Sequence, residues 1–219
     1  MTPDYNKAAT AAMETLVKYG IATAPVLPFP IFKRTAGVLV LSFAEISNAF
    51  NIDRKHFVNF VGEENQDAVT VVNTDDGKLR YVVTYNQRLP FYMLQRSLAR
   101  ELGHIILNHD GSREVEVCTA EAYCFAYHLL CPRPLIKAVQ EAGVKLTVEV
   151  LGNMTGCYER CLLGIKQTPG ANVPAELNRK VKAQFADYLT NFLDYQSIIE
   201  ASDVSAVADF GTYMNNYIE

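Results

Sequence analysis

The hydrophobic and polar positions follow two different periods, which divide the chain into a strand-rich part and a helical part. Short runs rich in β-branched apolar residues predict strands at residues 37–43, 68–73 and 79–86. The pair Asp76-Gly77 lies between the last two runs and favours a tight hairpin turn. From Pro90 onward the apolar positions recur every three or four residues, as they do in helices. The pattern predicts a small antiparallel sheet followed by a helical half, which is an α+β fold.

The same periodicity sets the expected helix boundaries. Residues 4–19 and 44–60 are predicted helices, and the prolines between them (Pro25, Pro28 and Pro30) predict an extended stretch. After Pro90 we expect further helices at residues 91–108, 114–131, 135–142, 147–166, 174–199 and 202–218, the fourth of them broken near residues 152–156.

Composition and charge narrow the class of protein. Of the 219 residues 49% are hydrophobic and 20% are charged, so the chain can bury a packed core. The net charge of −4 argues against a protein that binds nucleic acid through bulk electrostatics. The sequence has neither an apolar run long enough to span a membrane nor the pattern of a signal peptide. Five cysteines, an odd number, indicate reduced thiols, so we expect a cytoplasmic protein.

The charge is concentrated at one end of the chain. Residues 185–219 contain six acidic residues and neither lysine nor arginine, so we divide the chain into a main domain, residues 1–166, and an acidic helical extension, residues 171–219. Four aromatic residues of this extension share a helical face: Phe185, Tyr188, Phe192 and Tyr195. They predict either a stripe that docks on the main domain or a surface for a protein partner.

The stretch Arg100-Glu101-Leu102-Gly103-His104 carries the strongest chemical signal. In zinc peptidases the pattern His-Glu-x-x-His places two histidines on one helical face, where both bind the metal, and the glutamate activates the metal-bound water. Here the first histidine is replaced by arginine. A glycine inside a helix costs about 1 kcal/mol relative to alanine, so Gly103 predicts a close helix–helix contact.

Residues 86–136 resemble the ImmA/IrrE family of metallopeptidases, the M78-type proteins with a minimal thermolysin-like core. The resemblance is carried by Ala99-Arg100-Glu101-Leu102-Gly103-His104-Ile105-Ile106-Leu107-Asn108-His109. It is also carried by the run that begins at Glu121-Ala122 and ends at Leu129-Leu130-Cys131-Pro132. Relatives of known function cleave a DNA-binding repressor, so the resemblance implies a regulatory role in a mobile element or phage-type repressor system.

The resemblance also implies roles for individual residues. Glu101 matches the general base, His104 the second histidine ligand, and Glu121 is the best candidate for the acidic third ligand. The family often has another acid two residues earlier, where this chain has Thr119. Arg100 stands at the first ligand position.

An arginine side chain has no lone pair to give a metal, so the ligand set needs another member or is degenerate. His109 and His128 are the alternative ligands. His109 reaches the site only if the chain turns at Asn108. If no ligand replaces Arg100, its guanidinium is expected to pair with Glu101, with Glu121 or with both, because an unpaired buried charge is costly.

Two functions follow from these alternatives. In the first, the protein is a degenerate metallopeptidase-fold protein that binds a protein partner, such as a repressor, and needs no cofactor. In the second, it is an active zinc endopeptidase that cleaves a DNA-binding repressor. The sequence favours the first slightly, and for both we expect neither membrane association nor direct binding to nucleic acid.

Overall fold

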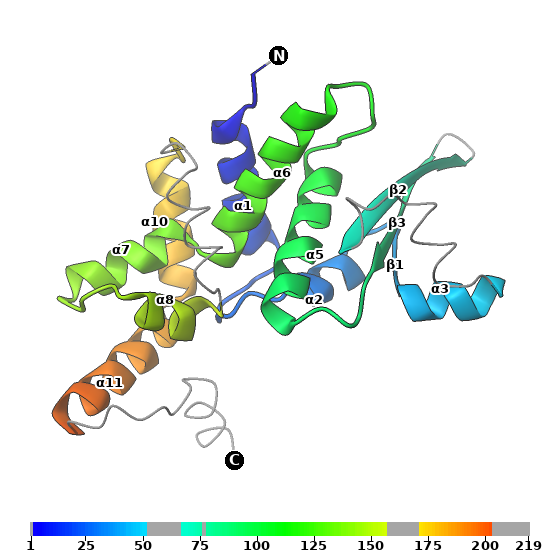
Figure 1. Cartoon of the computed structure of the whole chain (residues 1–219). Helices are drawn as coiled ribbons and strands as arrows, with labels where there is room; N and C mark the ends of the chain where they lie inside the picture. Colours follow the sequence, from blue (N-terminus) through cyan, green and yellow to red (C-terminus); the bar gives the residue numbers. More distant parts are fainter. Residues whose placement is uncertain (1, 52–66, 76–77, 157–170, 203–219) are drawn as a thin grey trace.

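The computed structural model describes residues 2–51, 67–75, 78–156 and 171–202, and the protein is α+β with a helical majority (Figure 1). The strands are β1 (Val38–Ser42), β2 (Ala68–Asp75) and β3 (Lys78–Tyr85). The helices are α1 (Tyr5–Lys18), α2 (Pro28–Lys33), α3 (Phe43–Phe50), α5 (Phe91–Ile106), α6 (Val115–Leu130), α7 (Arg133–Glu141), α8 (Val148–Thr155), α10 (Ala175–Gln184) and α11 (Ala186–Ser202). The predicted fold class is confirmed.

The sheet has the strand order β1-β3-β2 and is mixed. Strands β2 and β3 form the predicted antiparallel hairpin, with a register that runs from Ala68 opposite Tyr85 to Asp75 opposite Lys78. Strand β1, however, pairs in parallel with β3, so the prediction of a wholly antiparallel sheet is wrong. The hairpin was predictable because turn residues specify the pairing of adjacent strands. The partner of β1 lies beyond β2 in the chain, and no local signal specifies that pairing.

One helix was missed and several predictions lie outside the described residues. Helix α2 forms where three prolines predicted an extended stretch, and it begins at Pro28, because proline suits the first turn of a helix, whose N–H groups have no intrahelical partner. Helix α3 ends at Asn51, a left-handed cap, and α8 ends at Gly156 with φ 65°. The rest of the predicted helices 44–60 and 147–166, the turn residues 76–77, and residues 203–218 of the last predicted helix lie outside the described residues.

Helices α5 and α6 lie side by side in the middle of the molecule, with the sheet against α5 and with α1 against α6 (Figure 1). Gly103 allows α5 and α6 to approach closely. A Cβ atom at this position would lie 3.0 Å from the carbonyl oxygen of Ala122 and 3.1 Å from Cδ1 of Phe125. The close contact predicted from this glycine is confirmed.

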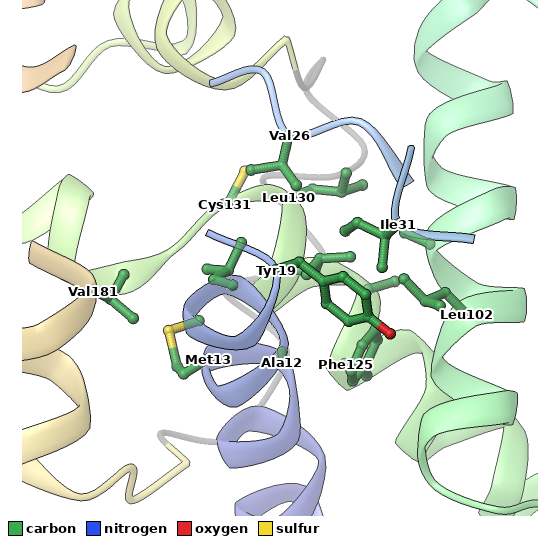
Figure 2. Packing of buried hydrophobic residues seen from close by; sticks show 14 of the residues in the cluster. Ala12, Met13, Tyr19, Val26, Ile31, Leu102, Phe125, Leu130, Cys131 and Val181 are labelled. Carbon is green, nitrogen blue, oxygen red and sulfur yellow. The ribbon is translucent and has the colours of Figure 1, made fainter. Parts of the chain in front are cut away.

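The core is formed between α1, α2, α5 and α6, and Figure 2 shows Ile31, Leu102 and Phe125 gathered on one side of α1, while Met13 points toward Val181 on the other side. It continues to the C-terminal helices, where the four residues of the aromatic stripe are almost completely buried (Phe185, Tyr188, Phe192 and Tyr195). The stripe is therefore docked on the body of the protein. None of the helices in the described part of the chain has the length and hydropathy needed to cross a membrane.

Candidate functional site

Helix α5 supplies Arg100, Glu101 and His104, and α6 supplies Glu121. His109 joins them because of the way α5 ends. Asn108 adopts a left-handed conformation, with φ 55°, and turns the chain back on itself. The N–H of His109 then donates to the carbonyl of His104, at 2.9 Å, and the N–H of Asn108 to that of Ile105, at 3.1 Å. These two bonds make up a Schellman motif, with asparagine where glycine is usual.

The guanidinium of Arg100 is bound to the carboxylate of Glu101. Nε and Nη2 of Arg100 lie 2.9 and 2.6 Å from Oε1 of Glu101, and Nη2 also donates to the carbonyl of Ala68, at 2.7 Å. The other carboxylate oxygen, Oε2, accepts a hydrogen bond from Oγ1 of Thr70, at 2.7 Å. Ala68 and Thr70 belong to β2, so this ion pair joins α5 to an edge strand of the sheet.

Both members of this pair are well buried, with side-chain exposures of 12% for Arg100 and 4% for Glu101. Burial raises the pKa of Glu101, while Arg100 and Thr70 favour its ionised form. Burial also opposes the charge of Arg100. Glu101 and Tyr123 together favour that charge more strongly, so the pKa of Arg100 is raised. The hydroxyl of Tyr123 accepts a hydrogen bond from Nη1 of Arg100, at 3.3 Å. Every nitrogen of the guanidinium is therefore engaged by protein.

Glu121 makes four hydrogen bonds, two at each carboxylate oxygen. Oε1 accepts from Nη2 of Arg113 and from the main-chain N–H of Asp4, both at 2.8 Å. Oε2 accepts from Nη1 of Arg113, at 2.8 Å, and contacts Nε2 of His109, at 3.1 Å. A carboxylate has about four lone-pair positions. All of them are occupied, so Glu121 has no oxygen lone pair free for a metal ion.

These bonds stabilise the ionised form of Glu121. Burial opposes its charge, but Arg113, Asp4 and His109 together lower the pKa of Glu121 to about 2. Sequence reasoning missed Arg113, the partner that Glu121 takes in place of Arg100. Arg113 lies in the loop between α5 and α6, eight residues before Glu121, where only its charge could have drawn attention to it. The sequence also contained no sign of Thr70 and Asp4, because their contacts with Glu101 and Glu121 join segments that are far apart in the chain.

The two histidines at the end of α5 contact each other. Nδ1 of His104 lies 3.0 Å from Nδ1 of His109, and the rings meet edge to face. Burial, with the nearby His109 and Arg100, lowers the pKa of His104 to about 4, so the ring is neutral at pH 7. His109 thus lies beside the site, as the turn at Asn108 permits.

His128 does not join this group. It lies seven residues after Glu121 on α6, which is about 10 Å along a helix. Its side chain is buried, and its Nε2 has no hydrogen-bond partner among the described residues. Burial, and to a smaller degree Arg133, lowers the pKa of His128 to about 4.

The residues present do not fit a zinc ion. Arg100, a cation, occupies the position of the first histidine in the pattern His-Glu-x-x-His, and the carboxylate of Glu101 is bound to it. Glu121, the candidate third ligand, has all its acceptor positions filled. Within the described residues, no group of three or more His, Cys, Asp or Glu side chains is arranged to hold a metal. Arg100, Glu101, His104, His109 and Glu121 are brought together, but as two hydrogen-bonded clusters rather than as one ligand set.

A comparison with protein families tests the resemblance to ImmA/IrrE proteins. A family model of Peptidase_M78, described as the IrrE N-terminal-like domain, matches residues 53–152. The match covers 100 of the 219 residues, and the resemblance of this part of the chain to ImmA/IrrE metallopeptidases is confirmed. No curated protein and no solved structure matches the chain.

Proposed function

We propose that this protein is a degenerate M78 metallopeptidase-fold protein that acts by binding a protein partner. The observation that carries the proposal is the ion pair between Arg100 and Glu101, at 2.6 Å. A general base must reach a metal-bound water with a free carboxylate oxygen. The carboxylate of Glu101 instead neutralises a permanent cation that stands where a metal ligand is expected.

Both buried acids of the site are paired with an arginine side chain. Loss of one ligand alone would leave two buried carboxylates without a cation, which costs several kcal/mol. Arg100 supplies the cation for Glu101, and Arg113 supplies the cation for Glu121. Each acid thus keeps a partner without a metal. This pairing supports a domain that keeps the metallopeptidase fold and its surfaces without peptidase activity. Binding of a protein partner is then the function that remains.

The partner class follows from the family. Relatives of known function act on DNA-binding repressors, so we place this protein in the regulation of a mobile element or a phage-type repressor system. The partner is then a protein, such as a repressor, and the compartment is the cytoplasm. The alternative is an active zinc endopeptidase, and the presence of Glu101 and His104 favours it. The experiment below distinguishes the two functions.

The experiment measures metal and cleavage together. The full chain is purified, incubated with zinc sulfate, exchanged into metal-free buffer and analysed for zinc by elemental analysis. We expect far less than one zinc per chain. A photo-crosslinking amino acid in place of Tyr127, a half-buried residue of α6, then captures the partner in cells, and mass spectrometry is expected to find that partner intact.

Two results would contradict the proposal. One is a full equivalent of tightly bound zinc in the parent protein. The other is a crosslinked partner recovered as fragments, with cleavage abolished by Glu101→Gln. Either result would establish the endopeptidase. The matched control is Glu116→Gln, because Glu116 is exposed at the start of the same helix as Glu121 and is expected to change neither measurement.

A further inference from the structure

Three cationic side chains gather where α1 and α2 end. Nζ of Lys18 and Cζ of Arg34 lie 5.3 and 5.2 Å from the ring centroid of Tyr19, and Nη1 of Arg34 donates to the carbonyl of Tyr19, at 2.6 Å. Lys33 precedes Arg34 and lies over the ring of Phe29, with Nζ at 4.9 Å from its centroid. All three cationic residues are exposed. Lys18, Lys33 and Arg34 thus form a basic cluster on the surface.

The neighbouring sequence offers this basic cluster no counter-ion. No aspartate or glutamate occurs between Glu14 and Glu45. The ion pairs found among the described residues are made by other side chains, and the basic cluster takes part in none of them. A helix C-terminus favours a nearby cation by about 0.3–1 kcal/mol, but that interaction leaves the charge exposed to solvent. The basic cluster can therefore still pair with acidic groups.

The exposed face of α11 carries the opposite charge. Asp187 and Asp194 are seven residues apart, which is almost two full helical turns, so both lie on one face. Both are exposed, and neither forms an ion pair with another described residue. Ile198 follows Asp194 by about one turn on the same face and is 50% exposed. We call these three residues the acidic face of α11.

The acidic face begins beside the basic cluster. Gln184, the last residue of α10, donates from Nε2 to the carbonyl of Leu16, at 2.8 Å, and to that of Ile21. Leu16 and Ile21 stand on either side of Lys18 in the chain, and Asp187 follows Gln184 by three residues. The molecule thus carries a cationic and an anionic surface next to each other. Under a two-fold axis each of two such surfaces meets the opposite one of a second copy.

We propose that the protein forms a two-fold symmetric dimer in which the acidic face of α11 in each copy contacts the basic cluster of the other. Two exposed apolar side chains, Ile198 and Leu27, the residue before α2, supply an apolar part of the interface. A nucleic acid fits the basic cluster less well, because the net charge is −4 and the rings of Tyr19 and Phe29 are already in contact with cations of the protein. Dimer formation does not rest on the proposed function.

Sedimentation velocity of the full chain measures the association. At about 0.05 M sodium chloride we expect a species of twice the chain mass of 24.4 kDa. Raising the salt to about 0.5 M screens exposed charges and is expected to raise the dissociation constant about tenfold. A parent protein that stays monomeric at every concentration, or a dimer whose dissociation constant does not respond to salt, would overturn the proposal.

Charge reversal tests the contact itself. One variant combines Lys18→Glu with Lys33→Glu, and the other combines Asp187→Lys with Asp194→Lys. Each alone is expected to weaken self-association about a hundredfold, because like charges then face each other. Mixed in equal amounts, the two variants are expected to form a heterodimer as stable as the parent dimer, since both contacts again join opposite charges. Arg34 is left unchanged because its guanidinium also caps α1. Variants that dimerise alone as the parent does, or folded variants that fail to associate when mixed, would contradict the proposed contact.

Two controls reverse charges elsewhere on the surface. Lys7→Glu lies at the other end of α1 and Glu116→Lys at the start of α6, and both positions are exposed. Neither control should change the dissociation constant of the dimer. Fluorescence anisotropy with a labelled DNA duplex tests the other class of ligand. A monomeric parent that binds the duplex, and loses that binding when Lys18 and Lys33 are both replaced by glutamate, would assign the basic cluster to nucleic acid and rule out the dimer.

Discussion

At position 100 an arginine stands where the pattern His-Glu-x-x-His has its first histidine, and its side chain forms one side of an ion pair. Its guanidinium donates to Glu101, to the carbonyl of Ala68 and to Tyr123, so no donor nitrogen is left without an acceptor. A buried pair of this kind adds little net stability, because desolvation offsets the Coulomb attraction. Removing one partner is costly, because the other charge is then left buried and unpaired.

The first prediction concerns this pair. Arg100→Met is expected to lower the free energy of unfolding by about 3–5 kcal/mol, measured by urea denaturation, because Glu101 loses its cation. The double variant Arg100→Met with Glu101→Gln is expected to recover most of that loss, since no buried charge remains. Lys137→Ala is the control. It breaks an exposed ion pair with Glu141, with side-chain exposures of 77% and 50%, and should change stability by less than about 0.5 kcal/mol. A double variant no more stable than Arg100→Met would contradict this account.

At the scale of single elements, the contact between α5 and α6 determines where the site residues stand. Gly103 lies one residue before His104, and Ala122 lies one residue after Glu121. The close approach at Gly103 therefore sets the separation of the two helices at the level of both hydrogen-bonded clusters. Part of the surface that a side chain at position 103 would meet is main chain of α6, which cannot move aside without shifting the whole helix.

The second prediction tests that contact. Gly103→Ala improves the intrinsic helix propensity by about 1 kcal/mol, yet we expect net destabilisation of about 1–3 kcal/mol from overpacking. The reason is the distance of 3.0 Å from the added Cβ to the carbonyl oxygen of Ala122. Thermal unfolding followed by circular dichroism measures the change, and Gln140→Ala, at an exposed position of α7, is the comparison. An increase in melting temperature for Gly103→Ala would show that the helices can separate at no cost.

Local signals in the sequence predicted much of the fold and part of the site. The hairpin follows from Asp76-Gly77 and the close helix contact from Gly103, since both depend on neighbouring residues or on one backbone position. The parallel pairing of β1 and the contact of Arg113 with Glu121 were not predictable, because they depend on how distant segments pack. His109 lies between these cases: its turn is local, but its partner on α6 is not.

For the whole molecule, buried histidines make stability depend on pH. The pKa of His104 and that of His128 are both lowered to about 4 from 6.5. Between these values the unfolded chain binds more protons than the folded protein, so stability increases with pH. The contribution of the two rings is fully present above pH 6.5 and is lost as the pH falls toward about 4. Glu121, with its pKa lowered to about 2 from 4.5, adds a further loss at lower pH.

The third prediction follows from this dependence. Urea unfolding at steps from neutral pH down to about pH 4 is expected to show a steady loss of stability in the parent protein. His128→Leu keeps a side chain of similar size and removes one of the three rings whose pKa is lowered, so its stability should fall less steeply over the same range. Its stability at neutral pH should stay close to that of the parent, because Nε2 of His128 has no hydrogen-bond partner among the described residues. An unchanged slope in His128→Leu would assign the dependence to other groups.

The four filled acceptor positions of Glu121 also limit what a single substitution at position 100 can do. Arg100→His would place an imidazole one helical turn before His104. That substitution alone would not free Glu121 for a metal ion, because Arg113 and the main chain at Asp4 would still occupy its carboxylate. A metal site built on these residues would therefore need changes at separate positions, at Arg100 and at Arg113.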